Sequence, residues 1–116
     1  MSSTKHFLLN NQEVNRKEID MHADERSIRE LELPPFEAAI KAGTESVMSS
    51  YNLVDGQHAS ENYSLLTKTL KQDLRFNGFI VSDWESVYSG VNAAKAGLDL
   101  EMPLGDHMNV KLKDAI

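Results

Sequence analysis

Four short runs dominated by apolar residues, each leading into polar residues, are spread along the chain. They are too short for helices and contain the branched and aromatic residue types that suit buried strands. We therefore expect strands around residues 7–9, 46–48, 78–81 and 98–101, the first preceded by Lys5-His6 and the last closed by Pro103.

Helical spacing of apolar positions separates most of these runs. Residues 25–41 carry one apolar side, but Pro34-Pro35 must interrupt it, because proline loses a helical hydrogen bond and clashes with the preceding turn. We predict two short helices there, the second ending at Gly43. Further helices are expected over residues 62–76, over 86–96 with Gly97 as terminator, and from Asp106 onward.

Alternation of strands and helices predicts a parallel sheet covered by helices. Right-handed crossovers would bring the carboxyl ends of all four strands to one edge, where α/β proteins bind ligands. The residues expected at this edge are Lys5-His6, Tyr51-Asn52, Asp83-Trp84 and Glu101. An eight-unit (β/α)8 barrel takes about 250 residues, and this chain holds only three to four β/α units. We therefore expect part of a TIM-like barrel, an internal piece of something larger.

Composition excludes several classes of function. Eighteen acidic against twelve basic residues give a net charge of -6, without the Lys/Arg cluster that a nucleic-acid partner requires. No apolar run approaches the roughly 20 residues of a membrane helix, and residues 1–5 lack the apolar core of a secretory signal. There is no cysteine, and the four histidines lack metal-site spacing, so we expect neither metal nor cofactor. The compartment is left open, because a missing N-terminal segment would carry any export signal.

Asp83 is the first candidate for chemistry, since it ends the Gly78–Val81 run with Trp84 beside it. A carboxylate under an anomeric carbon can attack it or stabilise an oxocarbenium-like transition state. A second carboxyl group must protonate the leaving oxygen, and the candidates near Asp83 in sequence are Glu85, Asp99 and Glu101. The alternative interpretation of Asp83 is a helix N-cap or a surface aspartate.

Other candidates also admit more than one interpretation. Lys5 and His6 suit sugar hydroxyls as donors, a buried Lys5 would suit a Schiff base, and a frayed terminus beside a core histidine is equally consistent. Met48 and Tyr51 could line a subsite or belong to the core. Trp84 could be a platform for a pyranose face or a core anchor.

Taken together, the chain resembles the N-terminal barrel domain of glycoside hydrolase family 3, the β-glucosidase and β-xylosidase type. The resemblance runs almost end to end and in order. The matching segments are Lys5-His6-Phe7 with Asn10–Glu13 and Arg16, Asp24–Arg26 with Arg29-Glu30, Leu33–Glu37, Ser46–Asn52, Leu65–Thr67, Gly78–Trp84 and Ala96–Pro103.

This resemblance implies a retaining β-glycosidase that removes terminal nonreducing sugars from a small β-glucoside or oligosaccharide by double displacement. Asp83 would be the nucleophile, and Lys5, His6, Met48, Tyr51 and Trp84 would bind the sugar, with Arg16 and Glu13 orienting them. The general acid of this family is normally a glutamate on a second domain, which residues 1–116 lack, so the chain alone should be nearly inactive.

Two further expectations accompany the resemblance. The single-domain N-acetylglucosaminidase branch carries Lys-His-Phe-Pro-Gly-His-Gly, whereas Leu8-Leu9 follows Phe7 here, which favours the two-domain branch. An incomplete barrel leaves two sheet edges unpaired, which predicts self-association. The rival hypotheses are a noncatalytic fragment that keeps part of a sugar site and, less favoured, a Schiff-base lyase using Lys5.

Overall fold

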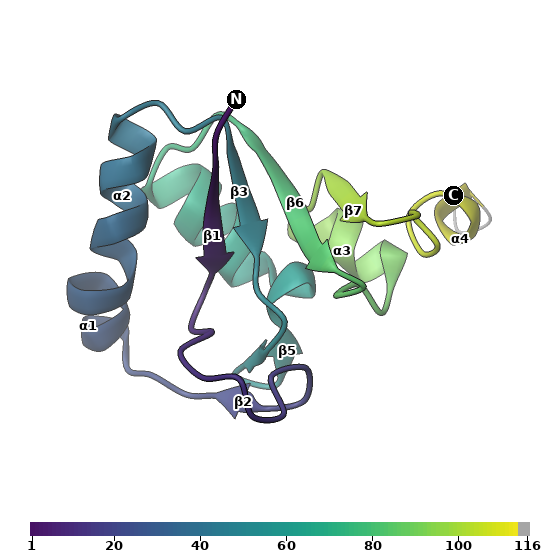
Figure 1. Cartoon of the computed structure of the whole chain (residues 1–116), viewed down its shortest axis with the longest axis horizontal. Coiled ribbons are helices and arrows are strands. Elements are labelled where there is room, and N and C mark those ends of the chain that lie inside the picture. The colour runs from purple at the N-terminus through teal and green to yellow at the C-terminus, as the bar shows by residue number, and fades with distance from the viewer. Residues whose placement is uncertain (114–116) are drawn as a thin grey trace.

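The computed structural model describes residues 1–113, and its centre is a four-stranded parallel sheet in the order β1-β3-β6-β7 (Figure 1). The strands are β1 Ser3–Phe7, β3 Ser46–Ser49, β6 Phe79–Trp84 and β7 Leu100–Met102. The predicted α/β class and the parallel sheet are confirmed. Two strands are shifted, since Leu8 and Leu9 lie buried beyond the end of β1 and Leu98 lies before β7.

The first crossover is one continuous helical run, so the prediction of two separate helices was wrong. It comprises α1 Glu25–Ser27, the wide π-helical turn η1 Ile28–Glu32, and α2 Leu33–Lys41. Pro34 and Pro35 fall in the first turn of α2, directly after the wide π-helical turn, and the chain stays helical through them. The run does end as predicted, with Gly43 in the left-handed conformation at φ 92°.

A second, smaller sheet in the order β2-β4-β5 had no counterpart in the sequence prediction. It consists of β2 Asp20–Met21, β4 Leu53–Val54 and β5 Gln57–His58. Asp55 and Gly56 form the turn between β4 and β5 with positive φ angles of 50° and 80°. This sheet extends the carboxyl side of β3 (Figure 1).

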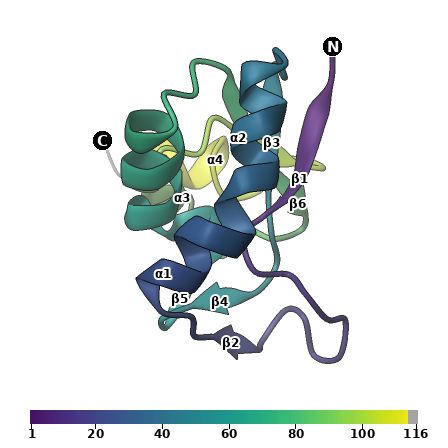
Figure 2. The same ribbon diagram turned by 90° about the vertical axis from the view of Figure 1, so that its left-hand side faces the viewer.

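The remaining helices follow the expected order along the chain, except that the helix before residue 62 was not predicted. They are the short 3-10 helix η2 Ala59–Glu61, the π-helical η3 Ser64–Asp73, α3 Gly90–Ala96 and α4 Val110–Lys113. The helices expected from residues 86 and 106 begin at residues 90 and 110, and residues 114–116 of the last one lie outside the described residues. Gly97 ends α3 as predicted, at φ 100°. Figure 2 shows the helices α2 and α3 on the same side of the main sheet. No helix in residues 1–113 combines the length and apolar character needed to cross a membrane.

The core lies between this sheet face and the helices. Val47 and Ile80 are register partners on β3 and β6, and both are fully buried. Phe7 packs edge to face on Phe36 of α2, with ring centroids 5.0 Å apart. Side chains alternate along a strand, so the face opposite this core carries Met48. The helices therefore hold the strands so that their carboxyl ends and one face stay open.

Candidate active site

Asp83 lies at the carboxyl end of β6 and is 9% exposed. One of its two carboxylate oxygens accepts a hydrogen bond. Its Oδ1 accepts the backbone N–H of Trp84 at 2.7 Å, whereas Oδ2 is buried and accepts no well-aligned hydrogen bond from residues 1–113. The N-cap of α3 is Ser89, so the helix-cap interpretation of Asp83 is wrong. One carboxylate oxygen is therefore held by a backbone N–H, and the other is buried beside His6.

His6 of β1 faces the Oδ2 atom of Asp83. Its Nε2 lies 3.2 Å from Asp83 Oδ2, a contact between β1 and β6 that passes over the end of the intervening strand β3. Burial lowers the pKa of His6 below its usual value, although the charge of Asp83 acts in the opposite direction. At neutral pH the imidazole is therefore neutral, and it can donate or accept a hydrogen bond beside the carboxylate.

Tyr51, just beyond β3, is the third side chain that gathers at Asp83. It is 5% exposed, and burial followed by the negative charge of Asp83 raises the pKa of its hydroxyl. The Arg16 guanidinium lies 4.4 Å from the centroid of the Tyr51 ring, and Arg16 Nη1 donates to Glu13 Oε2 at 2.7 Å. Arg16, in the loop after β1, thus packs on the face of the Tyr51 ring in a cation–π contact.

Trp84, Met48 and Lys5 surround this cluster with different exposures. Trp84 is 54% exposed at the end of β6, so its ring is free to stack and is not a core anchor. Met48 is half-buried on β3, and Lys5 is exposed on β1. The exposure of Lys5 removes the desolvation that would make a lysine amine nucleophilic in a Schiff-base enzyme.

Of the three carboxylates considered as acids, Asp99 and Glu101 are engaged elsewhere and Glu85 is exposed to solvent. Asp99 Oδ2 accepts the N–H of Ile80 at 2.8 Å and pairs with Lys71 Nζ at 3.0 Å, near the start of β6. Glu101 accepts the backbone N–H groups of residues 107 and 108. Glu85 is exposed, with Oε2 3.9 Å from Lys17 Nζ.

Small polar residues fix the loops around the site, and of these the sequence had placed only Asn52 at this edge. Ser82 Oγ accepts the N–H of Met102 at 2.9 Å and so ties the end of β6 to β7. Ser50 Oγ and Asn52 Nδ2 both donate to the Leu8 carbonyl, at 2.9 and 3.1 Å. Serine and asparagine at strand ends are common in turns, so no pattern in the sequence distinguishes these buried roles.

Comparison with known proteins agrees along nearly the whole chain. The model of the glycosyl hydrolase family 3 N terminal domain matches residues 1–115. A beta-glucosidase of Rhizobium radiobacter is 48% identical over 103 residues, which cover 88% of this chain and 13% of that protein. Thermostable beta-glucosidase B of Acetivibrio thermocellus is 48% identical over 100 residues, covering 85% of this chain and 13% of its own length.

Solved structures give the same result. A beta-glucosidase of Kluyveromyces marxianus superimposes with a TM-score of 0.90 at 34% identity, over 97% of this chain and 14% of its own. DesR, a beta-glucosidase from Streptomyces venezuelae in complex with D-glucose, gives a TM-score of 0.84 at 41% identity, over 88% of this chain and 13% of its own. The chain spans 13% to 14% of the length of these relatives. On the matched residues and the shared fold, the chain belongs to glycosyl hydrolase family 3 and carries sequence of its N-terminal domain.

Proposed function

We propose that this protein is part of a retaining β-glycosidase that removes terminal sugars from small β-glucosides or oligosaccharides. Its relatives are named beta-glucosidases, and one solved neighbour holds D-glucose. Residues 1–116 would supply about three to four units of a TIM-like (β/α)8 barrel, with a second domain outside them. The parallel sheet and its helices on one side are the geometry such a barrel requires.

The observation that carries this proposal is the Asp83 carboxylate. A nucleophile in double displacement needs one oxygen directed at the anomeric carbon and a support that fixes the other. The Trp84 N–H fixes Oδ1, and Oδ2 remains without a well-aligned donor from residues 1–113. Attack forms a bond between a carboxylate oxygen and the anomeric carbon while the bond to the leaving oxygen breaks. Water then hydrolyses the glycosyl ester and returns the free carboxylate.

The surrounding side chains suit the binding of a sugar ring. His6 and Lys5 on β1 would hold hydroxyl groups, Tyr51 would support the carboxylate, and Met48 would line the wall. Trp84 would flank the ring from its exposed position. Arg16 would act through Tyr51, because it stacks on that ring.

The general acid would come from outside residues 1–116. Asp99 is held by Lys71 and the Ile80 N–H, and Glu101 by a backbone turn. Glu85 is exposed, with a 3.9 Å contact to Lys17. General-acid help is worth about 10² to 10⁴ in rate, so the chain alone should hydrolyse ordinary glucosides slowly. A leaving group that needs no protonation avoids this requirement.

A suitable substrate is 2,4-dinitrophenyl 2-deoxy-2-fluoro-β-glucoside, an activated glycoside whose phenolate leaves without an acid and whose fluorine slows the second step. We expect a burst of dinitrophenolate that is stoichiometric with the chain. The Asp83→Asn variant should show no burst, whereas Glu85→Gln, a matched change in the next exposed carboxylate, should keep it. An equal burst from the chain and from Asp83→Asn would leave the noncatalytic hypothesis in place.

The predicted self-association also remains a proposal. The outer strands β1 and β7 have no neighbour on one side among the described residues. Unpaired strand edges are templates for pairing with another chain. Sedimentation velocity at increasing protein concentration should show a growing fraction of oligomer, and a single monomeric species throughout would refute the proposal.

A further inference from the structure

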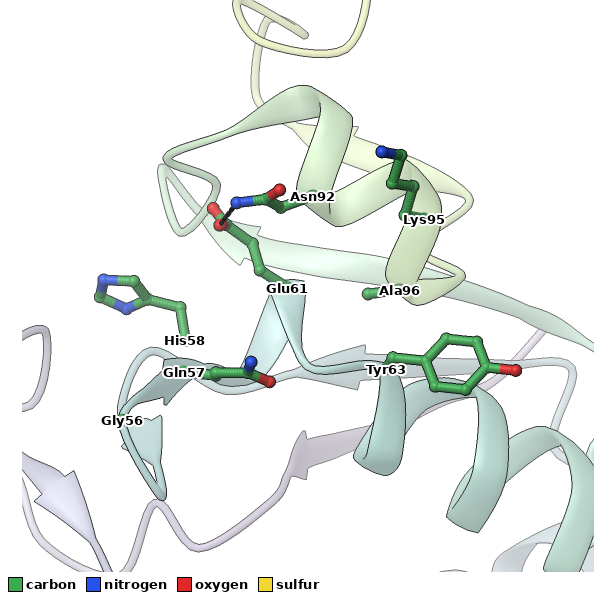
Figure 3. A pocket seen from close by; sticks show the side chains of 8 residues that line it. All are labelled: Gly56, Gln57, His58, Glu61, Tyr63, Asn92, Lys95 and Ala96. Carbon is green, nitrogen blue, oxygen red and sulfur yellow. Dashed lines mark hydrogen bonds between the residues drawn. The ribbon is translucent and has the colours of Figure 1, made fainter.

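A pocket of about 450 Å³ lies outside the candidate active site, between helix α3 and the chain segment from Gly56 to Tyr63 (Figure 3). Its volume is within the range of small-molecule sites. Its lining residues are Gly56, Gln57, His58, Glu61, Tyr63, Asn92, Lys95 and Ala96. None of them was singled out for function by the sequence.

The polar centre of this pocket is a carboxylate that is already held in place. Glu61 Oε1 accepts the backbone N–H groups of Tyr88 and Ser89 at 2.8 and 2.7 Å. Glu61 Oε2 has only a long contact with Asn92 Nδ2, at 3.5 Å. A carboxylate oxygen offers about two lone pairs, so Oε2 keeps the capacity to accept from a ligand. The Glu61 side chain is therefore already ordered, and binding through it adds no further cost in ordering that side chain.

Donors and an aromatic surface stand around this carboxylate. Within residues 1–113, the Gln57 amide and the Lys95 ammonium make no hydrogen bond or ion pair, and both residues are exposed. Figure 3 shows Lys95 on α3 and Gln57 on the opposite segment, with the extended Lys95 side chain directed away from Gln57. The Tyr63 ring, 46% exposed, lies at the end of the pocket away from His58.

The combination selects one class of ligand. An anion would meet the Glu61 carboxylate, and an apolar ligand would find only Tyr63 and Ala96 as partners. A neutral polyhydroxyl ring can donate to Glu61, accept from Lys95 and Gln57, and lay its C–H face on Tyr63. We propose that this pocket is a second saccharide-binding site for a neutral mono- or disaccharide, separate from Asp83. Only the choice of a β-linked glucose disaccharide as probe rests on the proposed function.

Hydrogen bonds link the pocket to the candidate active site. Ser60 Oγ, on the same short helix as Glu61, donates to the Ser86 carbonyl, and Ser86 Oγ donates to the Asp83 carbonyl at 3.1 Å. Together with the bonds from Glu61 to residues 88 and 89, these contacts span the loop that follows Trp84. A saccharide in the pocket would thus stabilise the loop that follows the exposed tryptophan.

The test is a titration of the ¹⁵N-labelled chain with cellobiose, followed by the backbone amide shifts. We expect saturable shifts at Gln57, Glu61, Tyr63 and Lys95. Tyr63→Phe should keep them, and Tyr63→Ala should weaken binding about fivefold, as expected for the loss of one aromatic contact. Gln57→Ala, an exposed change that spares the fold, should also weaken it.

Trp84→Ala separates this inference from the proposed function. It should abolish shifts around Asp83 and leave those of the pocket intact, so failure at one site is distinguishable from failure at the other. Absence of saturable shifts at the pocket would overturn the inference. Equal cellobiose affinities for the unaltered chain, Tyr63→Ala and Gln57→Ala would also overturn it. Larger amide shifts with sulfate than with cellobiose would do the same.

Discussion

Removing the two side chains that hold the Leu8 carbonyl should destabilise the protein by more than the sum of the separate losses. Leu8 is fully buried just beyond β1, and its carbonyl accepts Ser50 Oγ at 2.9 Å and Asn52 Nδ2 at 3.1 Å. Asn52 Nδ2 also donates to the Leu53 carbonyl at 3.1 Å. These bonds connect the loop that carries Arg16 to the end of β3, where Tyr51 lies.

The magnitudes follow from counting what each variant leaves unpaired. Ser50→Ala removes one hydrogen bond and should lower the free energy of unfolding by about 1 kcal/mol, while Asn52→Ala removes two and should cost about 2 kcal/mol. In either variant the Leu8 carbonyl keeps one donor. In the double variant it has neither, and a buried orphan carbonyl adds about 1 to 3 kcal/mol. The coupling energy should therefore be of that size.

Urea unfolding followed by circular dichroism gives the four free energies of this cycle. The double variant should lose a large part of the roughly 5 to 15 kcal/mol by which a domain is stable. It is therefore also measured in trimethylamine N-oxide, which stabilises the folded state. Asn77→Ala, at an exposed asparagine, is the matched control and should be nearly neutral. Additivity within about 0.5 kcal/mol would refute the shared-acceptor reasoning.

Three further predictions concern packing, titration and the tryptophan. Gly90→Ala should destabilise the fold by about 1 to 3 kcal/mol in urea unfolding, since a Cβ there would overlap a backbone carbonyl of the facing loop; unchanged stability would contradict the close approach. In an NMR pH titration His6 should titrate below 6.5, because burial lowers its pKa, and His22 above 6.5, because a hydrogen bond to Asp55 raises its pKa. Stability linked to His6 is thus present above pH 6.5 and falls as pH drops, that of His22 is present below 6.5 and falls as pH rises, and the reverse order of titration would refute both assignments. Trp84→Ala should change the free energy of unfolding by less than about 1 kcal/mol, because the ring is 54% exposed, yet weaken phenyl β-glucoside binding several-fold by calorimetry; a large loss of stability would indicate a core role instead.

Much of the main sheet could be predicted because its strands are buried and short. Val47 and Ile80 sit in apolar runs whose only stable location is between a sheet face and helices, and Gly43 and Gly97 mark the helix ends. The strand expected at residues 7–9 is β1 at residues 3–7. Leu8 and Leu9 are apolar and buried like strand residues, but they lie in the loop after β1. Hydrophobicity reports burial and does not distinguish a strand from a buried connection.

The candidate site was predictable only in part, for a similar reason. The abrupt end of an apolar run placed Asp83 at a strand terminus, where the structure has it. The pairing of Asp83 with His6 depends on register across β3, and the contact of Arg16 with Tyr51 depends on a loop. Contacts between residues far apart in sequence are set by tertiary packing, which local patterns do not encode. The small sheet built from β2, β4 and β5 was missed because its strands have only two residues each.

The most direct test of the central claim is to locate the covalent intermediate. The chain is incubated with 2,4-dinitrophenyl 2-deoxy-2-fluoro-β-glucoside, digested, and mapped by tandem mass spectrometry. We predict a single fluoroglucosyl ester on the Asp83 carboxylate that is absent from the Asp83→Asn variant. An adduct on any other residue, Glu85 or Lys5 included, would contradict the assignment of Asp83 as the nucleophile.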